Sequence, residues 1–173
     1  KKCAMRGGFA DYQELAVAFN DFRAAGKEVV FYFDNASNMN YAFAAGVADA
    51  IYLNPMGSID LRGMSISLPF VGEMLDSLGV EIVNLRSHET KSAFNFLSES
   101  HMPQAERDSY ELVFGDIYDD MLAMIEEGRG SKLTKPVKDI VNGGPYMMQS
   151  RIEGLGLVDG FIYDDEIKDT LED

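Results

Sequence analysis

Helical and strand-like patterns alternate along this chain, and that alternation restricts the folds open to it more than any other feature. Between Asp11 and Ala25 apolar residues recur at helical spacing, and Gly26 follows where a helix commonly ends. Residues 29–33, VVFYF, then predict a short strand that is buried on both faces. A helix that leads directly into a buried strand favours an α/β fold.

The alternation continues after this strand. We expect a polar turn at residues 34–38 and then, at residues 41–47, a helix of small apolar residues that packs tightly under a sheet. Residues 51–53 predict a second strand, which the turn-forming residues at 54–57 should close.

The remainder of the chain predicts a third strand and further helices. The strand is expected at residues 80–85, and three strands separated by helical patterns favour a parallel sheet. The longest helix should present one apolar stripe and end at Gly128 and Gly130. Helices are expected at residues 70–78, 103–127, 136–141 and 146–153, with a strand-like segment at 156–159.

Length and charge limit the domain count and the partners. The 173 residues suit one domain, so we expect residues 1–173 to form a single domain that is a fragment of a larger protein. The formal charge of −14 repels phosphate backbones, so nucleic acid is not an expected partner. No window reaches the roughly 18 to 20 apolar residues of a membrane span, and the segment itself is expected to be soluble.

The usual metal and nucleophile patterns are weak here. One cysteine, Cys3, and two histidines do not provide a zinc ligand set, and no cofactor is expected. Cys3 lacks an activating histidine nearby in the sequence, and His88 and His101 have no Ser or Cys partner at a recognised spacing. The acidic residues are too numerous for the sequence to single out a catalytic carboxylate pair.

Lys91 is distinguished by its position. It follows the predicted strand at 80–85 and a polar loop at 86–90, and it precedes an apolar helical turn at 93–97. A free lysine has a pKa near ~10.4, and apolar surroundings can lower that value enough for the amine to act as a base. The same local pattern is also typical of a solvated surface lysine.

Four stretches of the chain, in order, resemble the signal peptide peptidase A (protease IV) family, specifically the first half of its long form, which is built from two related halves. The last of the four, TKSAF, contains Lys91, and a weaker match, GLGLVD, covers residues 154–159. The four stretches are FRAAGKEVV at residues 22–30, IYLNPMGSIDLRG at 51–63, LDSLGV at 75–80 and TKSAF at 90–94.

The resemblance implies a crotonase-like (Clp protease-like) α/β fold with repeated ββα-type units and flanking helices. It implies a serine endopeptidase of Ser/Lys dyad type that degrades residual signal peptides without a cofactor. In the long form the lysine comes from the first half and the serine from the second, and Lys91 matches that lysine. Family members form homotetramers anchored in the bacterial inner membrane, with the catalytic part facing the periplasm.

The sequence departs from the family pattern at the nucleophile. Where a Ser-Gly-Gly-Tyr-like stretch is expected, residues 38–41 are Asn-Met-Asn-Tyr, so Asn38 replaces the serine. Ser37 lies one residue earlier, and Ser58 resembles a serine that assists the lysine in the half that holds the nucleophile. This segment is therefore expected to be inactive alone and to be completed by a serine-bearing second half.

Two rival interpretations stay open. In one, Ser37 and Lys91 form a self-contained dyad. In the other, the segment is a non-catalytic scaffold that serves only assembly. The sequence does not specify the residues preferred at the cleavage site.

Overall fold

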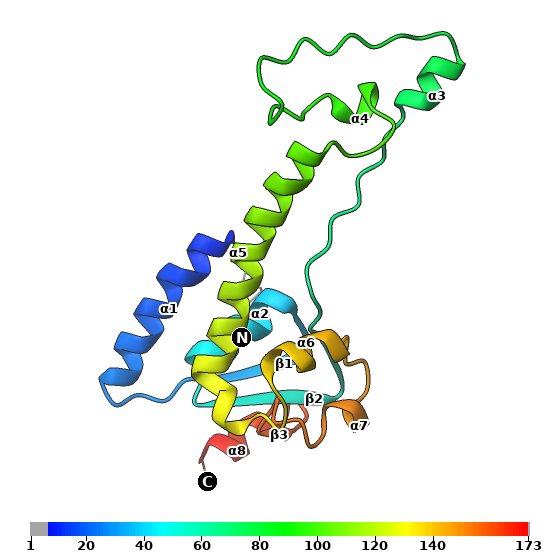
Figure 1. Cartoon of the computed structure of the whole chain (residues 1–173). Helices are drawn as coiled ribbons and strands as arrows, with labels where there is room; N and C mark the ends of the chain where they lie inside the picture. The colour runs from blue at the N-terminus through cyan, green and yellow to red at the C-terminus, as the bar shows by residue number, and fades with distance from the viewer. Residues whose placement is uncertain (1–6, 173) are drawn as a thin grey trace. The chain divides into compact units, whose positions relative to one another are not determined.

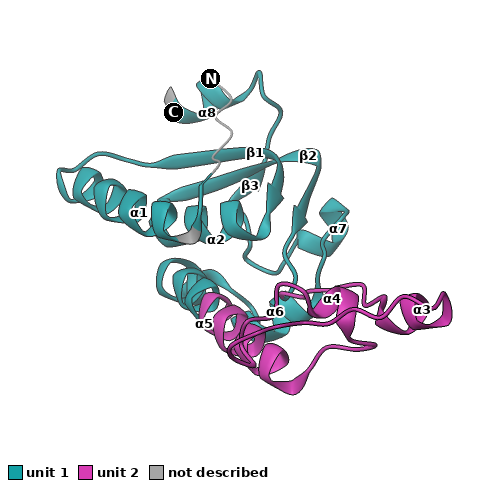
Figure 2. Ribbon diagram, turned by 90° about the horizontal axis from the view of Figure 1, so that it is seen from above, with its two compact units in different colours: residues 1–63, 119–173 teal, residues 64–118 magenta. Residues whose placement is uncertain are grey.

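The chain alternates helices and strands, as its sequence predicts (Figure 1). A computed structural model describes residues 7–172 and divides the chain into two units (Figure 2). Unit 1 comprises residues 1–63 and 119–173, and unit 2 comprises residues 64–118. The long helix α5, Gln104–Arg129, contributes residues to both units.

Unit 1 contains a three-stranded parallel sheet in the order β1-β2-β3. The strands are β1 (Val30–Ser37), β2 (Ala50–Asp60) and the short β3 (Gly160–Phe161). The parallel arrangement and the first two strands confirm the sequence-based prediction. The third strand comes from the end of the chain, directly after the segment whose composition is strand-like.

The predicted turn at residues 34–38 is wrong, because β1 and β2 continue past a bulge. Phe33 pairs with Leu53 and Asn35 pairs with Ser58, so Asp34 alone lies opposite residues 54–57. A Cβ atom on Gly57 would lie 2.3 Å from the Asp34 carbonyl oxygen, and therefore only glycine fits this bulge. The turn-forming residues bend the second strand locally and do not end it.

The core of unit 1 forms where helices α1 (Phe9–Ala24) and α2 (Asn38–Val47) pack together and against the sheet. The ring of Phe43 on α2 contacts Tyr12 and Phe19 of α1 at centroid distances of 5.6 Å each. It also contacts Phe31 of β1 at 5.9 Å. Both predicted helices are confirmed, and Gly26 after α1 has the positive φ of 77° expected of a helix end.

Helix α5 ends at Arg129, between the two glycines predicted to end it, and Gly128 also has a packing role. A Cβ atom there would lie 1.9 Å from the Ala45 carbonyl oxygen, so the missing side chain lets α5 lie directly against the backbone of α2. Met121 and Ile125 on the predicted apolar stripe are fully buried. Val113, on the same stripe within unit 2, is 55% exposed.

The last third of unit 1 consists of short helices. A β-bridge between Tyr146 and Ile59 prevents the helix that was predicted to begin at residue 146 from starting there, so α7 is only Gln149–Ile152. The remaining elements are the 3₁₀ helix η1 (Gly130–Lys132), α6 (Val137–Gly143) and α8 (Ile167–Glu172).

Unit 2 consists of α3 (Gly72–Ser77), α4 (Asn95–Ser98), the first half of α5 and long irregular segments. The predicted helix at 70–78 is confirmed as α3. The predicted strand at 80–85 is wrong: it pairs with no strand in the described part of the chain, and Val83 and Leu85 are 70% and 92% exposed. An apolar run becomes a strand only where a neighbouring strand is available to pair with it.

An ion pair between a buried arginine and a partly exposed aspartate connects three parts of unit 1. The Arg129 side chain, 2% exposed, places Nη1 2.8 Å from Oδ2 of Asp159 and donates from Nε to the Gly156 carbonyl at 2.9 Å. The Asp159 carboxylate also accepts hydrogen bonds from Lys132 Nζ and from the Ile51 backbone N–H, both at 2.8 Å. These contacts join the end of α5, the start of β2 and the segment before β3.

The Asp159 carboxylate is strongly stabilised in its charged form. Burial alone raises its pKa, but the hydrogen bonds from Arg129, Lys132 and Ile51 outweigh that effect and lower the pKa to about 2. A carboxyl group with a lowered native pKa stabilises the fold above its unfolded-state pKa of 3.8. That contribution is lost as the pH falls through the native pKa.

The first prediction concerns this carboxylate. Between pH 6 and pH 2, the wild-type protein should lose about 1 kcal/mol more unfolding free energy than the Asp159→Asn variant, because only the wild type can protonate this group and solvent screens its partly exposed ion pairs. Urea unfolding at a series of pH values measures the difference. Asp139→Asn, at an exposed carboxylate on α6, is the control and should follow the wild type. Parallel pH profiles for wild type and Asp159→Asn would contradict the account.

The second prediction concerns the close approach of α5 to α2. Gly128→Ala should lower the free energy of unfolding by about 2 kcal/mol, because the added methyl group meets the Ala45 carbonyl oxygen. Gly115→Ala in the same helix, where a Cβ has nothing within 4 Å, should instead stabilise by up to about 1 kcal/mol. Thermal unfolding of both variants checks the sign, and equal effects would show that the contact does not matter.

Candidate functional site

Lys91 lies in unit 2, on the loop that precedes α4. Its backbone N–H donates to the His88 carbonyl at 3.1 Å, and its side chain is exposed. The apolar residues that follow do not cover it, because Phe94 and Phe96 are themselves 62% and 43% exposed. A lysine that acts as a base needs a desolvated site, and the residues of this loop do not provide one.

Asn38, the residue in place of the expected nucleophile, has a structural role. It is the first residue of α2, and its Oδ1 atom accepts a hydrogen bond of 2.7 Å from the Arg62 backbone N–H. Its side chain thereby joins the start of α2 to the segment that leaves β2. A carboxamide is not a nucleophile for peptide cleavage, and here it is an acceptor.

Ser37 is the last residue of β1 and the N-cap of α2. Its side chain is exposed, and its hydroxyl makes no capping hydrogen bond to the described first turn of α2. In the sheet register it lies opposite Asp60, which forms an exposed ion pair with Arg62 at 2.7 Å. Ser37 is therefore an accessible hydroxyl at the carboxyl end of a parallel strand, where ligands of open α/β sheets commonly bind.

The Ser58 hydroxyl forms a hydrogen bond across the β1–β2 pair, directly after the bulge. Its Oγ atom donates to Asn35 Oδ1 at 2.8 Å, and its backbone N–H donates to the same oxygen at 3.1 Å. Asn35, Ser37, Asn38 and Ser58 thus lie together near the carboxyl-terminal ends of β1 and β2. Lys91 belongs to unit 2.

The remaining candidate residues do not form a catalytic arrangement in the described part of the chain. Ser100 Oγ lies 3.0 Å from His101 Nδ1, a pair that sequence spacing did not suggest, but both side chains are exposed and lack water-excluding surroundings. His88 is exposed, and Cys3 lies outside the described residues. Among residues 7–172 no group of three or more potential ligands could hold a metal ion.

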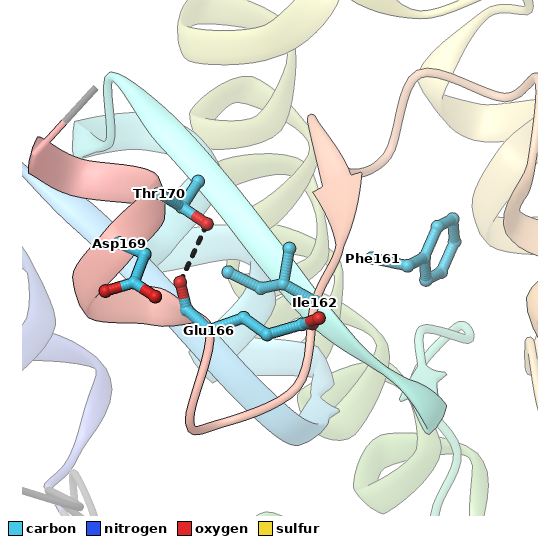
Figure 3. A pocket seen from close by; sticks show the side chains of 5 residues that line it. All are labelled: Phe161, Ile162, Glu166, Asp169 and Thr170. Atoms are coloured by element: carbon cyan, nitrogen blue, oxygen red, sulfur yellow. Dashed lines mark hydrogen bonds between the residues drawn. The ribbon is translucent and has the colours of Figure 1, made fainter.

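A pocket of about 520 Å³ in unit 1 lies apart from the residues that the sequence suggested (Figure 3). The Thr170 hydroxyl on its wall donates to the Glu166 carbonyl oxygen at 2.8 Å. The pocket offers carboxylates and apolar side chains but neither a lysine nor a serine. It is lined by Phe161, Ile162, Glu166, Asp169 and Thr170.

The fold and the sequence comparisons together identify the class and then the family. Strands that alternate with helices around a parallel sheet define a mixed α/β protein. A sequence model of Peptidase family S49 matches residues 21–173. The chain therefore belongs to peptidase family S49, the family of signal peptide peptidase A.

Three relatives illustrate the range of similarity. Protease 4 of Haemophilus influenzae is 33% identical over 115 residues, which is 66% of this chain and 18% of the relative. The chloroplastic serine protease SPPA of Arabidopsis thaliana is 22% identical over 166 residues, 96% of this chain and 24% of the relative. Protease 4 of Salmonella typhi is 29% identical over 115 residues, again 66% and 18%. The chain thus spans about a fifth to a quarter of the length of these relatives.

Within residues 7–172, each helix is too short or too polar to cross a bilayer.

The third prediction tests the structural role of Asn38. Asn38→Ala should lower the free energy of unfolding by about 1 kcal/mol, because the Arg62 N–H loses its acceptor. Asn38→Asp keeps an acceptor and should retain wild-type stability, helped by a negative charge at a helix start. Ser37→Ala is the control and should change stability by less than about 0.5 kcal/mol. Urea unfolding compares the three, and equal stability of Asn38→Ala and wild type would rule the role out.

Proposed function

We propose that this chain supplies Lys91 as the general base of a serine/lysine peptidase, while the nucleophilic serine comes from a second half of the same protein. One observation carries the proposal: the T-K-S-A motif at residues 90–93 is intact, whereas the position expected for the nucleophile holds Asn38. Membership of peptidase family S49 supports serine-peptidase chemistry.

In the proposed reaction the neutral Lys91 amine accepts the proton of the serine hydroxyl as the serine oxygen attacks the scissile carbonyl carbon. Backbone N–H groups stabilise the oxyanion that forms. The protonated amine then gives its proton to the leaving nitrogen as the C–N bond breaks. Water, deprotonated by the same amine, releases the acyl group and restores the serine.

The exposure of Lys91 supports an arrangement in two halves. A lysine base must be shielded from water to be neutral near pH 7. In this chain Phe94, close to the lysine in sequence, is also exposed. A second half that covers this loop would exclude water from the lysine and bring the serine to it in one step.

We extend the proposal to the whole protein. Its fold is crotonase-like (Clp protease-like), with residues 1–173 as one domain of repeated ββα-type units. Its substrates are peptides, specifically residual signal peptides, and it acts as a homotetramer attached to the bacterial inner membrane with its catalytic part on the periplasmic side. The relatives named Protease 4 and serine protease SPPA support the peptidase part of this proposal.

Two alternatives remain as proposals. A scaffold role, in which the chain only supports assembly, is favoured by the exposed apolar side chains around Lys91, which suit an interface. A self-contained dyad of Ser37 and Lys91 is favoured by the exposed Ser37 hydroxyl at the end of β1.

The fourth prediction separates these alternatives. In the full-length protein, Lys91→Ala and Lys91→Arg should each lower kcat on a short apolar peptide by about 10³-fold or more, because arginine keeps the charge but cannot give up its proton. Ser37→Ala should retain wild-type kcat. Steady-state kinetics of the purified variants measures both effects.

Each other outcome identifies a rival. Full activity in Lys91→Ala would make this chain a scaffold. Full activity in Lys91→Arg alone would show that Lys91 contributes charge and not proton transfer. A loss of activity in Ser37→Ala as large as that in Lys91→Ala would establish the self-contained dyad.

A further inference from the structure

The loop that carries Lys91 is closed at its base by a side-chain hydrogen bond. Arg86 precedes the loop and Asn95 ends it, and Arg86 Nη1 donates to Asn95 Oδ1 at 2.7 Å. The contact joins residues that are 9 positions apart, with Lys91 between them. The two ends of the loop are thereby fixed to each other.

The same asparagine ties the loop to helix α5. Asn95 is fully buried, and its Nδ2 atom donates to Oε2 of Glu106 at 2.9 Å. Glu106, in the first turn of α5, is only 4% exposed. All three residues of this chain of contacts, Arg86, Asn95 and Glu106, belong to unit 2. We refer to them as the loop clamp.

Neighbouring groups reinforce the loop clamp. Asn84 Nδ2 donates to Asn95 Oδ1 at 3.2 Å and to Ser98 Oγ at 3.3 Å. Arg86 Nη2 lies 3.8 Å from Glu99 Oε1. Arg86 thus has its positive charge between a carboxylate and the oxygen end of the Asn95 amide.

The electrostatics of the loop clamp favour one arrangement. The amide of Asn95 has its oxygen toward the Arg86 cation and its nitrogen toward the Glu106 carboxylate, so both ends of its dipole face an opposite charge. Inside a protein such charge-assisted hydrogen bonds are strong, and a buried partner left without one is costly. The polar contacts therefore restrain the loop more than its exposed apolar residues can.

We propose that Arg86, Asn95 and Glu106 are positioning residues that hold the Lys91 loop in the geometry needed for proton transfer. This inference rests on the proposed function of Lys91. Proton transfer requires donor and acceptor within hydrogen-bond reach, and a displacement of about 1 Å can cost about 10²-fold in rate. A looser loop should therefore lower kcat and leave substrate binding unchanged.

The fifth prediction uses two substitutions of Glu106 in the full-length protein. Glu106→Gln keeps an oxygen acceptor for Asn95 Nδ2 and should retain kcat within about twofold. Glu106→Leu keeps the bulk but removes the acceptor, and should lower kcat by about 10- to 100-fold with KM within about twofold. The contrast between Gln and Leu separates hydrogen bonding from packing.

A second pair of variants covers the case in which Glu106→Leu does not fold. Arg86→Ala removes the cation that donates to Asn95 Oδ1 from a side chain that is 28% exposed, and it should show the same loss of kcat at constant KM. Arg107→Ala, at an exposed arginine on α5, is the matched control and should retain wild-type kinetics.

The outcomes distinguish this inference from the function on which it rests. Wild-type kcat in both Glu106→Leu and Arg86→Ala, beside inactive Lys91→Ala, would overturn the loop clamp and leave the proposed function standing. Full activity in Lys91→Ala would overturn the proposed function and the loop clamp with it. Loss of kcat in Glu106→Leu and Arg86→Ala, recovery in Glu106→Gln and inactive Lys91→Ala would support both.

Discussion

The ion pair between the buried Arg129 and Asp159 is the interaction on which unit 1 depends. It fixes the end of α5 to the segment before β3 and, through the Ile51 N–H, to the start of β2. Next to it the Tyr41 hydroxyl donates to the Leu157 carbonyl at 2.8 Å, and burial raises the pKa of this tyrosine. Together these contacts join α2, the start of β2, the end of α5 and the segment before β3 within unit 1.

Under the proposed function, the junction between β1 and α2 keeps its structure without the nucleophile. Asn38 stands where the serine is expected, and its side chain holds the chain as it leaves β2. In the proposed account, Asn38 provides a structural acceptor at the strand-to-helix junction in place of a reactive hydroxyl. In unit 2 the T-K-S-A motif is retained on a loop with its own polar anchor, Asn95. Under the proposed function, unit 1 contributes the parallel sheet and unit 2 contributes the lysine base.

The sequence predicted the elements that local patterns determine and missed those that distant contacts determine. The helix at 11–25 and its glycine end are encoded within one window, and the structure confirms them. The strand at 80–85 has the right composition but no partner strand in the described residues. Two contacts could not be predicted from local sequence patterns: the ion pair of Arg129 with Asp159 and the hydrogen bond of Asn95 with Glu106. Lys91 was found through the family motif, because its local pattern alone also fits an exposed lysine.

The central claim is that an amine at position 91 takes the serine proton, and restoring that amine chemically tests it most directly. In the full-length protein, Lys91→Cys should be inactive, and alkylation with 2-bromoethylamine, which rebuilds a lysine-like side chain, should restore kcat at least tenfold. Alkylation with iodoacetamide, which adds no base, should restore nothing, and wild type treated with each reagent is the control. Full activity of Lys91→Cys before alkylation, or equal recovery with iodoacetamide, would contradict the claim.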